Sequence, residues 1–517
     1  MKKQLIHILA IAVLFLAGCD TTSTTTLLNG DFLPADTSLP NILSPEEGDT
    51  VLNLTADLRW TAKEGAEYYS IEVATDGAFA QQITGSPFRV AAPNTFYKLT
   101  LPSAGTYYWR LRASVTASGQ YASSYFEAKE DCLYVYFPYD PADPDAKPDD
   151  TDKTGNIDNP YQTINRAMAE AYRLGISTVK VASRGEISAG NFAAYEEYFI
   201  LKDGVNILGG YNPDFSIRHD FNTGLENNPY ETRLEGKYNQ NITIENIFAP
   251  TLIEGITIRT ENNTGLEVKK SGCELVISKS IIISNNTNYS NALSLSSTGI
   301  RVTGNIIKSG NAQNTSYGIF NQYGDPEIVN NLIISGSSDE QTSYAIYNNY
   351  NAAKPVIINN TIIAGEAASF SQTSAGLYNY DIDSDCMPIV INNIIISTDN
   401  TDTRYGIYGS GAGDINYHYN CIYGNGGTDY TGITADGTNV TGVNPNLDAD
   451  YKLTASSPDS VKYGGYDVYN DTENYEYVTP MDEYLTDIIG TDRTTGWPTA
   501  SDPGNGGSGW SMGAYEY

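Results

Sequence analysis

The feature that most constrains the fold is a repeat that begins near residue 156 and continues through most of the remaining chain. A polar residue followed by apolar ones recurs at Ser280, Asn305, Asn331, Asn360, Asn393 and Asn420, with separations of 25, 26, 29, 33 and 27 residues. Each repeat consists of short β-rich runs and turn residues, and it is too small to bury its own apolar side chains. Because stacked repeats can share one continuous core, this period predicts a β-solenoid.

A second repeated position supports the same register. Gly318-Ile319-Phe320-Asn321 recurs at residues 345–348, 376–379 and 406–409 with similar residues. Side chains alternate along a strand, so the aliphatic residues are expected to point inward and the aromatic ones outward. The stacked asparagines are expected to form a hydrogen-bonded ladder. The outward aromatic residues are Phe320, Tyr347, Tyr378 and Tyr408.

Two interpretations of this aromatic column stay open at this point. Rings repeated at the strand spacing form a stripe on which sugar rings could lie, which predicts carbohydrate binding. The same rings could stack on one another and serve only to stabilise the solenoid.

Both ends of the repeat carry features that are typical of closed solenoids. At the start, residues 159–164 open a helical stretch in which Ile164, Ala167, Met168, Ala171 and Leu174 share one face. At the end come Ser-Ser-Pro-Asp at 456–459 and Met-Gly-Ala-Tyr-Glu-Tyr at 512–517. With the repeat, these segments make residues 156–517 resemble a right-handed parallel β-helix of the pectate-lyase-like superfamily. The resemblance implies an all-β fold with an N-terminal capping helix and a C-terminal cap.

The first residues predict a cellular location rather than a fold. Lys2 and Lys3 precede an apolar run that ends in Leu16-Ala17-Gly18-Cys19, which resembles the bacterial lipobox. The resemblance implies a lipoprotein signal peptide at 1–18, a diacylated Cys19, and a flexible tether to residue 37. An ordinary cleaved secretory signal is the alternative. We expect a membrane-anchored protein, at the outer membrane or cell surface rather than the inner membrane.

Residues 38–128 alternate apolar and polar positions in short runs separated by turn residues, which predicts a small β-sandwich. Pro45, Trp60 and the run from Gly105 to Arg112 make this segment resemble a fibronectin type III domain. Trp60 and Trp109 are expected in its core. Residues 129–155 are rich in proline and aspartate and predict a solvated acidic linker.

The charge balance excludes one class of partner. Lys and Arg number 30 against 62 Asp and Glu, so the formal net charge is −32. Binding to nucleic acid needs a basic face, and no cluster of basic residues occurs, so no nucleic-acid partner is expected.

Evidence for catalysis is sparse. The Gly-His-Gly and Arg-x-Lys motifs of hydrolases with this fold are absent, and no catalytic residue transfers by resemblance. Asp381, Asp383 and Asp385 form an acidic cluster beside Lys354 that could hold Ca²⁺, or could be an exposed acidic loop. His219 and His418 are isolated and are expected to have hydrogen-bonded structural roles.

These observations lead to two hypotheses from different classes. The first is a surface-anchored lipoprotein without catalytic activity, whose β-helix binds glycans or mediates adhesion to polysaccharide or surface protein. The alternative is a Ca²⁺-dependent polysaccharide lyase or glycoside hydrolase with a divergent active site. A purely structural surface component would show neither binding nor cleavage.

Overall fold

The computed structural model describes residues 39–515 of the 517-residue chain, with internal gaps. The gaps are 52–53, 104, 117–119, 129–131, 144–145, 189–190, 227, 237–240, 273, 350–353, 369–372, 383–387, 399–403, 412–415, 434–435, 467–486 and 489–510. The chain divides into two compact units, one ending at Glu130 and the other beginning at Asp131. Each has its own hydrophobic core, and we describe each by itself.

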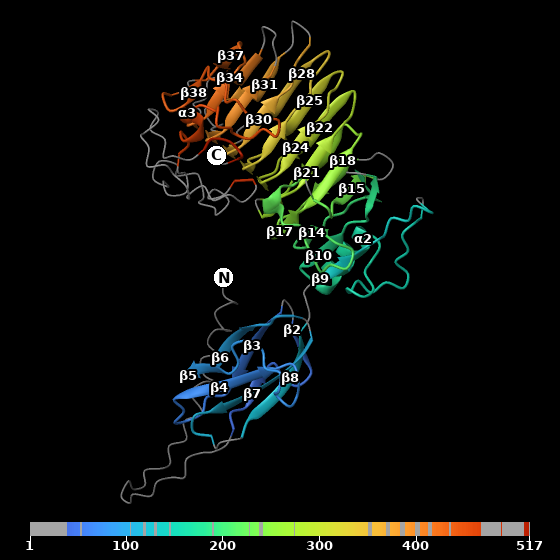
Figure 1. Ribbon diagram of the computed structural model, residues 1–517, viewed down its shortest axis with the longest axis vertical. Coiled ribbons are helices and arrows are strands. Elements are labelled where there is room, and N and C mark those ends of the chain that lie inside the picture. Colours follow the sequence, from blue (N-terminus) through green and yellow to red (C-terminus); the bar gives the residue numbers. More distant parts are fainter. Residues whose placement is uncertain are drawn as a thin grey trace, which may run out of the picture. The chain divides into compact units, whose positions relative to one another are not determined.

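The first unit is an all-β domain built from two sheets, as predicted (Figure 1). One sheet contains β1 (Ile42–Ser44), β3 (Thr55–Trp60) and β6 (Phe96–Thr100). The other contains β2 (Asp49–Val51), β8 (Ala122–Ala128), β7 (Gly105–Ala113), β4 (Tyr68–Ala74) and β5 (Phe88–Ala91). Trp60 and Trp109 are buried in the core that the two sheets share, which confirms that expectation. The indole N–H of Trp109 donates to the carbonyl of Pro45 at 3.3 Å.

The second unit is a parallel β-solenoid of about 8 turns, which confirms the predicted fold class. Its first sheet contains β9 (Cys132–Val135), β10 (Thr178–Ala182), β14 (Asn206–Tyr211), β17 (Thr251–Glu254), β20 (Leu275–Ser278), β23 (Arg301–Thr303), β26 (Glu327–Val329), β29 (Val356–Ile358), β32 (Ile389–Ile391) and β35 (Asn416–His418). Its second sheet contains β13 (Ala194–Glu197), β15 (Thr232–Gly236), β18 (Ile256–Thr260), β21 (Ile281–Ser284), β24 (Ile306–Ser309), β27 (Leu332–Ile334), β30 (Thr361–Ala364), β33 (Ile394–Ser397), β36 (Cys421–Tyr423) and β38 (Val440–Thr441).

The third sheet of the solenoid has eight strands, and these carry the repeated aromatic residues. They are β16 (Ile242–Glu245), β19 (Thr264–Lys269), β22 (Tyr289–Ser296), β25 (Thr315–Gln322), β28 (Thr342–Asn349), β31 (Ser374–Ile382), β34 (Arg404–Gly411) and β37 (Thr428–Thr431). Figure 1 shows successive coils stacked with their strands parallel. A short hairpin of β11 (Glu186–Ser188) and β12 (Asn191–Phe192) and a 3-10 turn at Phe221–Thr223 lie outside the three sheets.

From β17 onward, a repeated turn links each strand of the first sheet to the next strand of the second. The residue before the repeated polar position has a positive φ, for example 56° at Asn330 and 57° at Asn359. Asparagine tolerates this left-handed conformation better than most residues. The next residue is a buried asparagine, and its side-chain amide donates to the amide oxygen of its counterpart one coil on. This ladder runs through Asn305, Asn331, Asn360, Asn393, Asn420 and Asn439 at distances of 2.9 to 3.0 Å.

The predicted second ladder is also present, inside the third sheet. Asn321 donates to Asn348 at 3.2 Å, and Asn348 donates to Asn379 at 2.8 Å. The amide of Asn379 then donates to the hydroxyl of buried Tyr417 at 2.6 Å. The long ladder satisfies buried side-chain amides, whereas Oδ1 of Asn321, at the start of the second ladder, has no hydrogen-bond partner among the described residues. Both ladders link successive coils in register.

A helix packs on the first coils, as the sequence predicts. The helix α2 (Ile164–Leu174) buries Ile164, Ala167, Met168 and Ala171 in the solenoid core. Leu174 was expected on the same face, but it is 49% exposed. It is the last residue of the helix, which ends at Gly175 with a φ of 71°. The backbone N–H groups of Ile164 and Asn165 donate to the carboxylate of Glu197 at 2.7 and 2.9 Å.

The segment predicted as a linker is part of the solenoid. Residues 132–135 form β9, which pairs in parallel with β10 and is the first strand of the first sheet. The carboxylate of Asp150, also within the predicted linker, accepts a hydrogen bond from the backbone N–H of Gln162 at 2.6 Å. Leu133 and Val135 belong to the core of the solenoid, and burying their apolar side chains favours pairing of this segment with the first sheet.

The C-terminal residues pack against the outer side of the second sheet. After α3 (Asp459–Lys462), Met512 is buried beside Ile394 and Cys421, and Ala514 is buried beside Ile281 and Ile306. This packing explains why the repeated strands carry several apolar residues in a row. Their middle residue points into the solenoid core, and their neighbours are covered by the end of the chain.

Candidate functional site

The predicted aromatic column is formed on the outer side of the third sheet. Phe320, Tyr347, Tyr378 and Tyr408 occupy equivalent positions of β25, β28, β31 and β34 and pair directly across successive coils. Their ring centroids lie 5.4, 5.5 and 4.5 Å apart along the column. All four side chains are partly exposed, while the residues before them, such as Ile319 and Ile346, are fully buried.

A second aromatic column, which our sequence reasoning missed, runs beside the first. It contains Tyr317, Tyr344 and Tyr405, with Ala375 at the equivalent position of β31. The rings of Tyr317 and Phe320 lie 5.9 Å apart, and those of Tyr344 and Tyr347 lie 5.6 Å apart. We call these seven residues the aromatic strip: Tyr317, Phe320, Tyr344, Tyr347, Tyr378, Tyr405 and Tyr408.

The second column exists because the two residues between the aromatic positions are both buried. In a regular strand, residues three apart lie on opposite faces. Here Gly318 and Ile319 are both buried, so Tyr317 and Phe320 both reach the outside. A side chain at Gly318 would place its Cβ 2.6 Å from the carbonyl oxygen of Ala345. The recurring tyrosine followed by glycine or alanine was therefore the available signal.

Ring stacking determines what the strip offers to a ligand. Tyr378 lies between Tyr344 and Tyr408, with centroid distances of 4.3 and 4.5 Å and interplanar angles of 21° and 7°. Both faces of the Tyr378 ring are therefore covered by neighbours. Within the strip, this residue can offer only its ring edge and its hydroxyl to a sugar.

The hydroxyls of Tyr347 and Tyr378 stay protonated at neutral pH. Burial is the main cause that raises the pKa of Tyr347 to about 12, with neighbouring tyrosines adding to it. Burial and the neighbouring Tyr408 raise the pKa of Tyr378 to about 12. A protonated phenol both donates and accepts hydrogen bonds, so these groups can pair with the hydroxyls of a sugar.

Hydroxyl and amide groups border the strip where its strands begin. The hydroxyl of Tyr317 lies 3.2 Å from that of Thr342. In the turns before β25 and β28, the side-chain amide of Gln341 donates to Asn314 at 3.0 Å, and Asn314 in turn donates to Asn288. The strip and its border thus form a surface of aromatic edges, hydroxyls and amides, next to the carboxylate of Glu340, which accepts from the amide of Gln313 at 2.7 Å.

The predicted calcium site lies mostly outside the described residues. Asp383 and Asp385 lie outside the described residues, as does the side chain of Asp381. Lys354 is described, and its backbone N–H donates to the carboxylate of Asp325. Within the described part of the chain, no group of three histidine, cysteine, aspartate or glutamate side chains could hold a metal ion. The predicted lipidation residue, Cys19, also lies outside the described residues.

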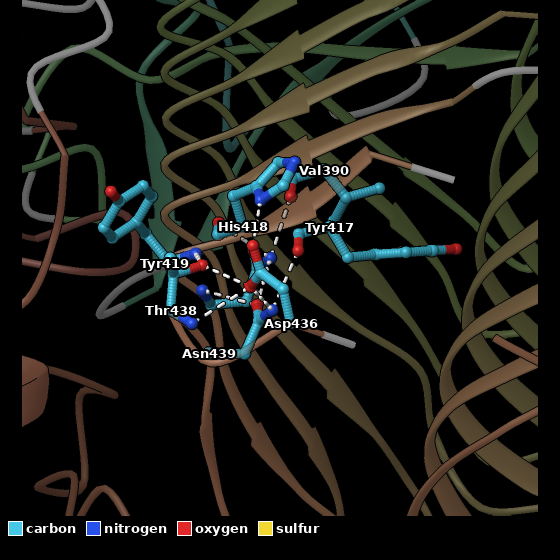
Figure 2. Close-up of polar contacts among 8 residues, drawn as sticks. Val390, Tyr417, His418, Tyr419, Asp436, Thr438 and Asn439 are labelled. Atoms are coloured by element: carbon cyan, nitrogen blue, oxygen red, sulfur yellow. Dashed lines mark hydrogen bonds and ion pairs between the residues drawn. The ribbon is translucent and has the colours of Figure 1, made fainter. Parts of the chain in front are cut away.

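His418 makes a hydrogen-bonded contact at the C-terminal end of the solenoid (Figure 2). Its Nδ1 lies 2.6 Å from a carboxylate oxygen of Asp436. The other oxygen of Asp436 accepts from the backbone of Thr438 at 3.0 Å and from the amide of Asn439 at 2.9 Å. Because Asn439 is the last member of the long asparagine ladder, this arrangement closes the ladder. His219 likewise contacts the carbonyl of Gly224 at 2.8 Å.

A charged groove of about 680 Å³ lies on the outer side of the first sheet. Several of its charged groups bind one another or the backbone. Arg301 donates to Glu327 at 2.9 Å, and the amine of Lys279 donates to the carbonyl of Ile488 at 2.8 Å. Burial lowers the pKa of this amine. These contacts connect coils and hold the C-terminal segment, so the aromatic strip is the stronger candidate for ligand binding.

The fold and these surfaces define a β-solenoid protein with a separate N-terminal β-domain. No known protein family matches the sequence, and no curated protein matches it either. One solved structure, described as the crystal structure of FN3tt, is similar to 18% of this chain and 97% of its own length, with 21% identity and a TM-score of 0.14. A TM-score this low establishes no shared fold. Among the described residues, no helix has the length and apolarity needed to cross a membrane.

Proposed function

We propose that this protein is a surface lipoprotein whose solenoid binds polysaccharide along the aromatic strip, without cleaving it. The observation that carries the proposal is the outward column of four stacked aromatic residues over four coils, flanked by the second column of Tyr317, Tyr344 and Tyr405. Aromatic side chains and hydroxyl groups are the side chains that sugars contact most readily, through C–H groups and through hydrogen bonds.

The repeat also matches a repetitive ligand. Neighbouring strands lie about 4.8 Å apart, so four coils present similar groups over about 14 Å. An extended sugar chain lying along the solenoid axis would meet a tyrosine edge or hydroxyl at every coil. Binding energy would then come from several weak, equivalent contacts rather than from one deep pocket.

The test uses residues 20–517, which lack the predicted signal peptide, and a panel of polysaccharides probed by affinity electrophoresis. We expect at least one to retard the protein, and we expect Tyr347→Ala with Tyr378→Ala to remove the retardation. The control pair is Tyr172→Ala with Tyr198→Ala, because these tyrosines are 59% and 49% exposed and lie outside the strip. Binding that survives the strip substitutions would contradict the proposed site.

The same incubations separate this proposal from the enzymatic alternative. We expect no release of reducing ends, with or without added Ca²⁺. Cleavage of any polysaccharide in the panel would overturn the non-catalytic proposal and support the lyase or hydrolase hypothesis. The Asp383→Ala variant would then show whether the acidic segment takes part.

Anchoring is a separate part of the proposal and rests on the lipobox-like sequence that ends in Cys19. Two acyl signals on one residue give stable membrane attachment, whereas a single chain gives only reversible binding. In a bacterial host, the full chain should incorporate labelled fatty acid and sediment with membranes. A Cys19→Ser variant that is still labelled would contradict lipidation at this residue.

A further inference from the structure

We infer that the ligand of the aromatic strip is an uncharged polysaccharide, recognised through hydroxyl groups rather than through carboxylates or sulfates. This inference deepens the proposed function and rests on it. It comes from the distribution of charge over the third sheet, which differs from that of the protein as a whole.

The middle of the third sheet has no charged residue. Strands β22, β25 and β28 together contain 24 residues, and none is Asp, Glu, Lys or Arg. At the 18% charged residues of the whole chain, about four would be expected, since 0.18 × 24 ≈ 4. Their partly exposed positions carry only hydroxyl, amide and aromatic side chains instead: Asn291, Thr315, Gln322, Thr342 and Asn349 accompany the strip.

Charged residues return at the sides of this surface. In the preceding strand, β19, the amine of Lys269 lies 2.8 Å from the carboxylate of Glu267. On the other side, the sequence of β31 includes Asp381, and Arg404, the first residue of β34, directly precedes Tyr405 of the strip. The uncharged surface therefore covers the part of the strip on β25 and β28, and it does not reflect a general shortage of charge in the solenoid.

Charge complementarity decides the class of ligand. A glycan that carries carboxylates or sulfates is normally held by arginine or lysine, which pair with those groups directly. The described residues of β22, β25 and β28 offer no such partner, and the net charge of −32 would repel a polyanion. A neutral glycan needs no cationic partner and is not repelled by the net charge. Its hydroxyls can pair with protonated phenols, threonines and amides.

The strip offers these groups at the right places for hydroxyl recognition. The ring of Tyr378 is covered on both faces, so its hydroxyl and edge are what a ligand meets. Tyr317 and Thr342 already place two hydroxyls 3.2 Å apart, which a sugar hydroxyl could join. Removing only the phenolic oxygens should therefore weaken binding, although the stacked rings remain.

The experiment measures binding of residues 20–517 by calorimetry to matched pairs of polysaccharides. Each pair shares a backbone and differs in charge: xylan with and without glucuronate groups, and polygalacturonate with and without methyl esters. We expect binding to a neutral member, changed by less than about twofold between about 50 mM and about 500 mM NaCl. We expect Tyr347→Phe with Tyr378→Phe to weaken it about tenfold, because two hydrogen bonds are lost. Neutral glucans, mannans and galactans complete the panel.

The outcomes separate this inference from the proposed function. Binding only to the charged members, weakened by salt and by the strip variants, would overturn the neutral class and leave glycan binding at the strip standing. Binding to a neutral glycan that the strip variants do not change would overturn both, as would no binding to any polysaccharide. The control is Tyr172→Phe with Tyr198→Phe, which removes two hydroxyls outside the strip.

Discussion

At the scale of single residues, the buried asparagines matter most for the stability of the solenoid. Asn360 is fully buried, and its amide N–H groups donate to Ile328, Ile358 and Asn393 at 2.8, 2.9 and 3.0 Å. Its oxygen accepts from the backbone and the side chain of Asn331 at 2.9 and 3.0 Å. Removing this side chain leaves several buried polar groups without partners, each costing about 1–3 kcal/mol.

We therefore expect Asn360→Ala to lower the free energy of unfolding of the solenoid by about 3 kcal/mol or more. Asn360→Ser should have an intermediate effect, because Ser280 already occupies the equivalent place and bonds the backbone of Ser278 and Ile256. Denaturant unfolding of both variants measures this order. An equal effect of alanine and serine would show that the ladder contributes through packing alone. Asn349→Ala, in β28, serves as the control.

The contact between His418 and Asp436 makes a prediction about pH. Burial alone would raise the pKa of Asp436, but hydrogen bonds from Thr438 and His418 lower it overall from 3.8. A carboxyl group whose pKa is lowered in the folded state stabilises the fold above its unfolded pKa and loses this effect as the pH falls through the folded pKa. We expect Asp436→Ala to melt lower than the parent at neutral pH and to approach it in strong acid. A difference in melting temperature that is constant from about pH 7 to about pH 2 would contradict this mechanism.

At the scale of elements, the helix α2 shows how charge and packing act together. The Glu197 carboxylate binds the first two N–H groups of the helix, where a negative charge is favourable. We expect Glu197→Ala to raise the exchange rate of the α2 amides with solvent about tenfold, since a lost helix cap costs about 1 kcal/mol or more. Glu196→Ala, at an exposed position of the same strand, should leave exchange unchanged. Equal exchange in the two variants would remove Glu197 from this role.

The same helix and the aromatic strip show what the sequence can and cannot predict. Spacing alone predicts that Ile164, Ala167 and other residues of α2 are buried, because one face of a helix repeats every three to four residues. Strand alternation likewise predicts the outward column that includes Phe320 and Tyr347. It fails for Tyr317, because Gly318 and Ile319 are both buried and strict alternation is lost between them. Gly318 lies close to the backbone of the next coil, and a single strand does not reveal such contacts.

At the scale of the whole molecule, the sequence predicted the solenoid correctly, because a short repeat of strands indicates stacked coils. It did not reveal that Cys132–Val135 begins the first sheet or that Ala514 packs beside Ile281. Both contacts involve segments that lie outside the repeat, so no periodic pattern predicts them. The predicted calcium cluster and lipid anchor lie outside the described residues and stay predictions.

The net charge of −32 leads to a prediction for the whole chain. Like charges repel more strongly in the compact state than in the unfolded chain, and salt screens this repulsion. We expect the melting temperature at neutral pH to rise by a few degrees between about 20 mM and about 500 mM NaCl. Scanning calorimetry measures this shift, with sucrose at equal osmolality as the control for an effect without screening. A melting temperature that falls with salt would show that attractive ion pairs outweigh the repulsion.

The asparagine ladder has a consequence for how such a protein can change in length. Each member from Asn305 to Asn420 bonds an identical neighbour through the same atoms at nearly the same distance. Duplicating or deleting one complete coil would therefore leave the remaining bonds of the ladder chemically unchanged. The length of the solenoid along its axis could therefore change through unequal recombination in the gene. Engineered chains with one coil more or fewer should still fold, with a proportionally longer or shorter row of outward tyrosines.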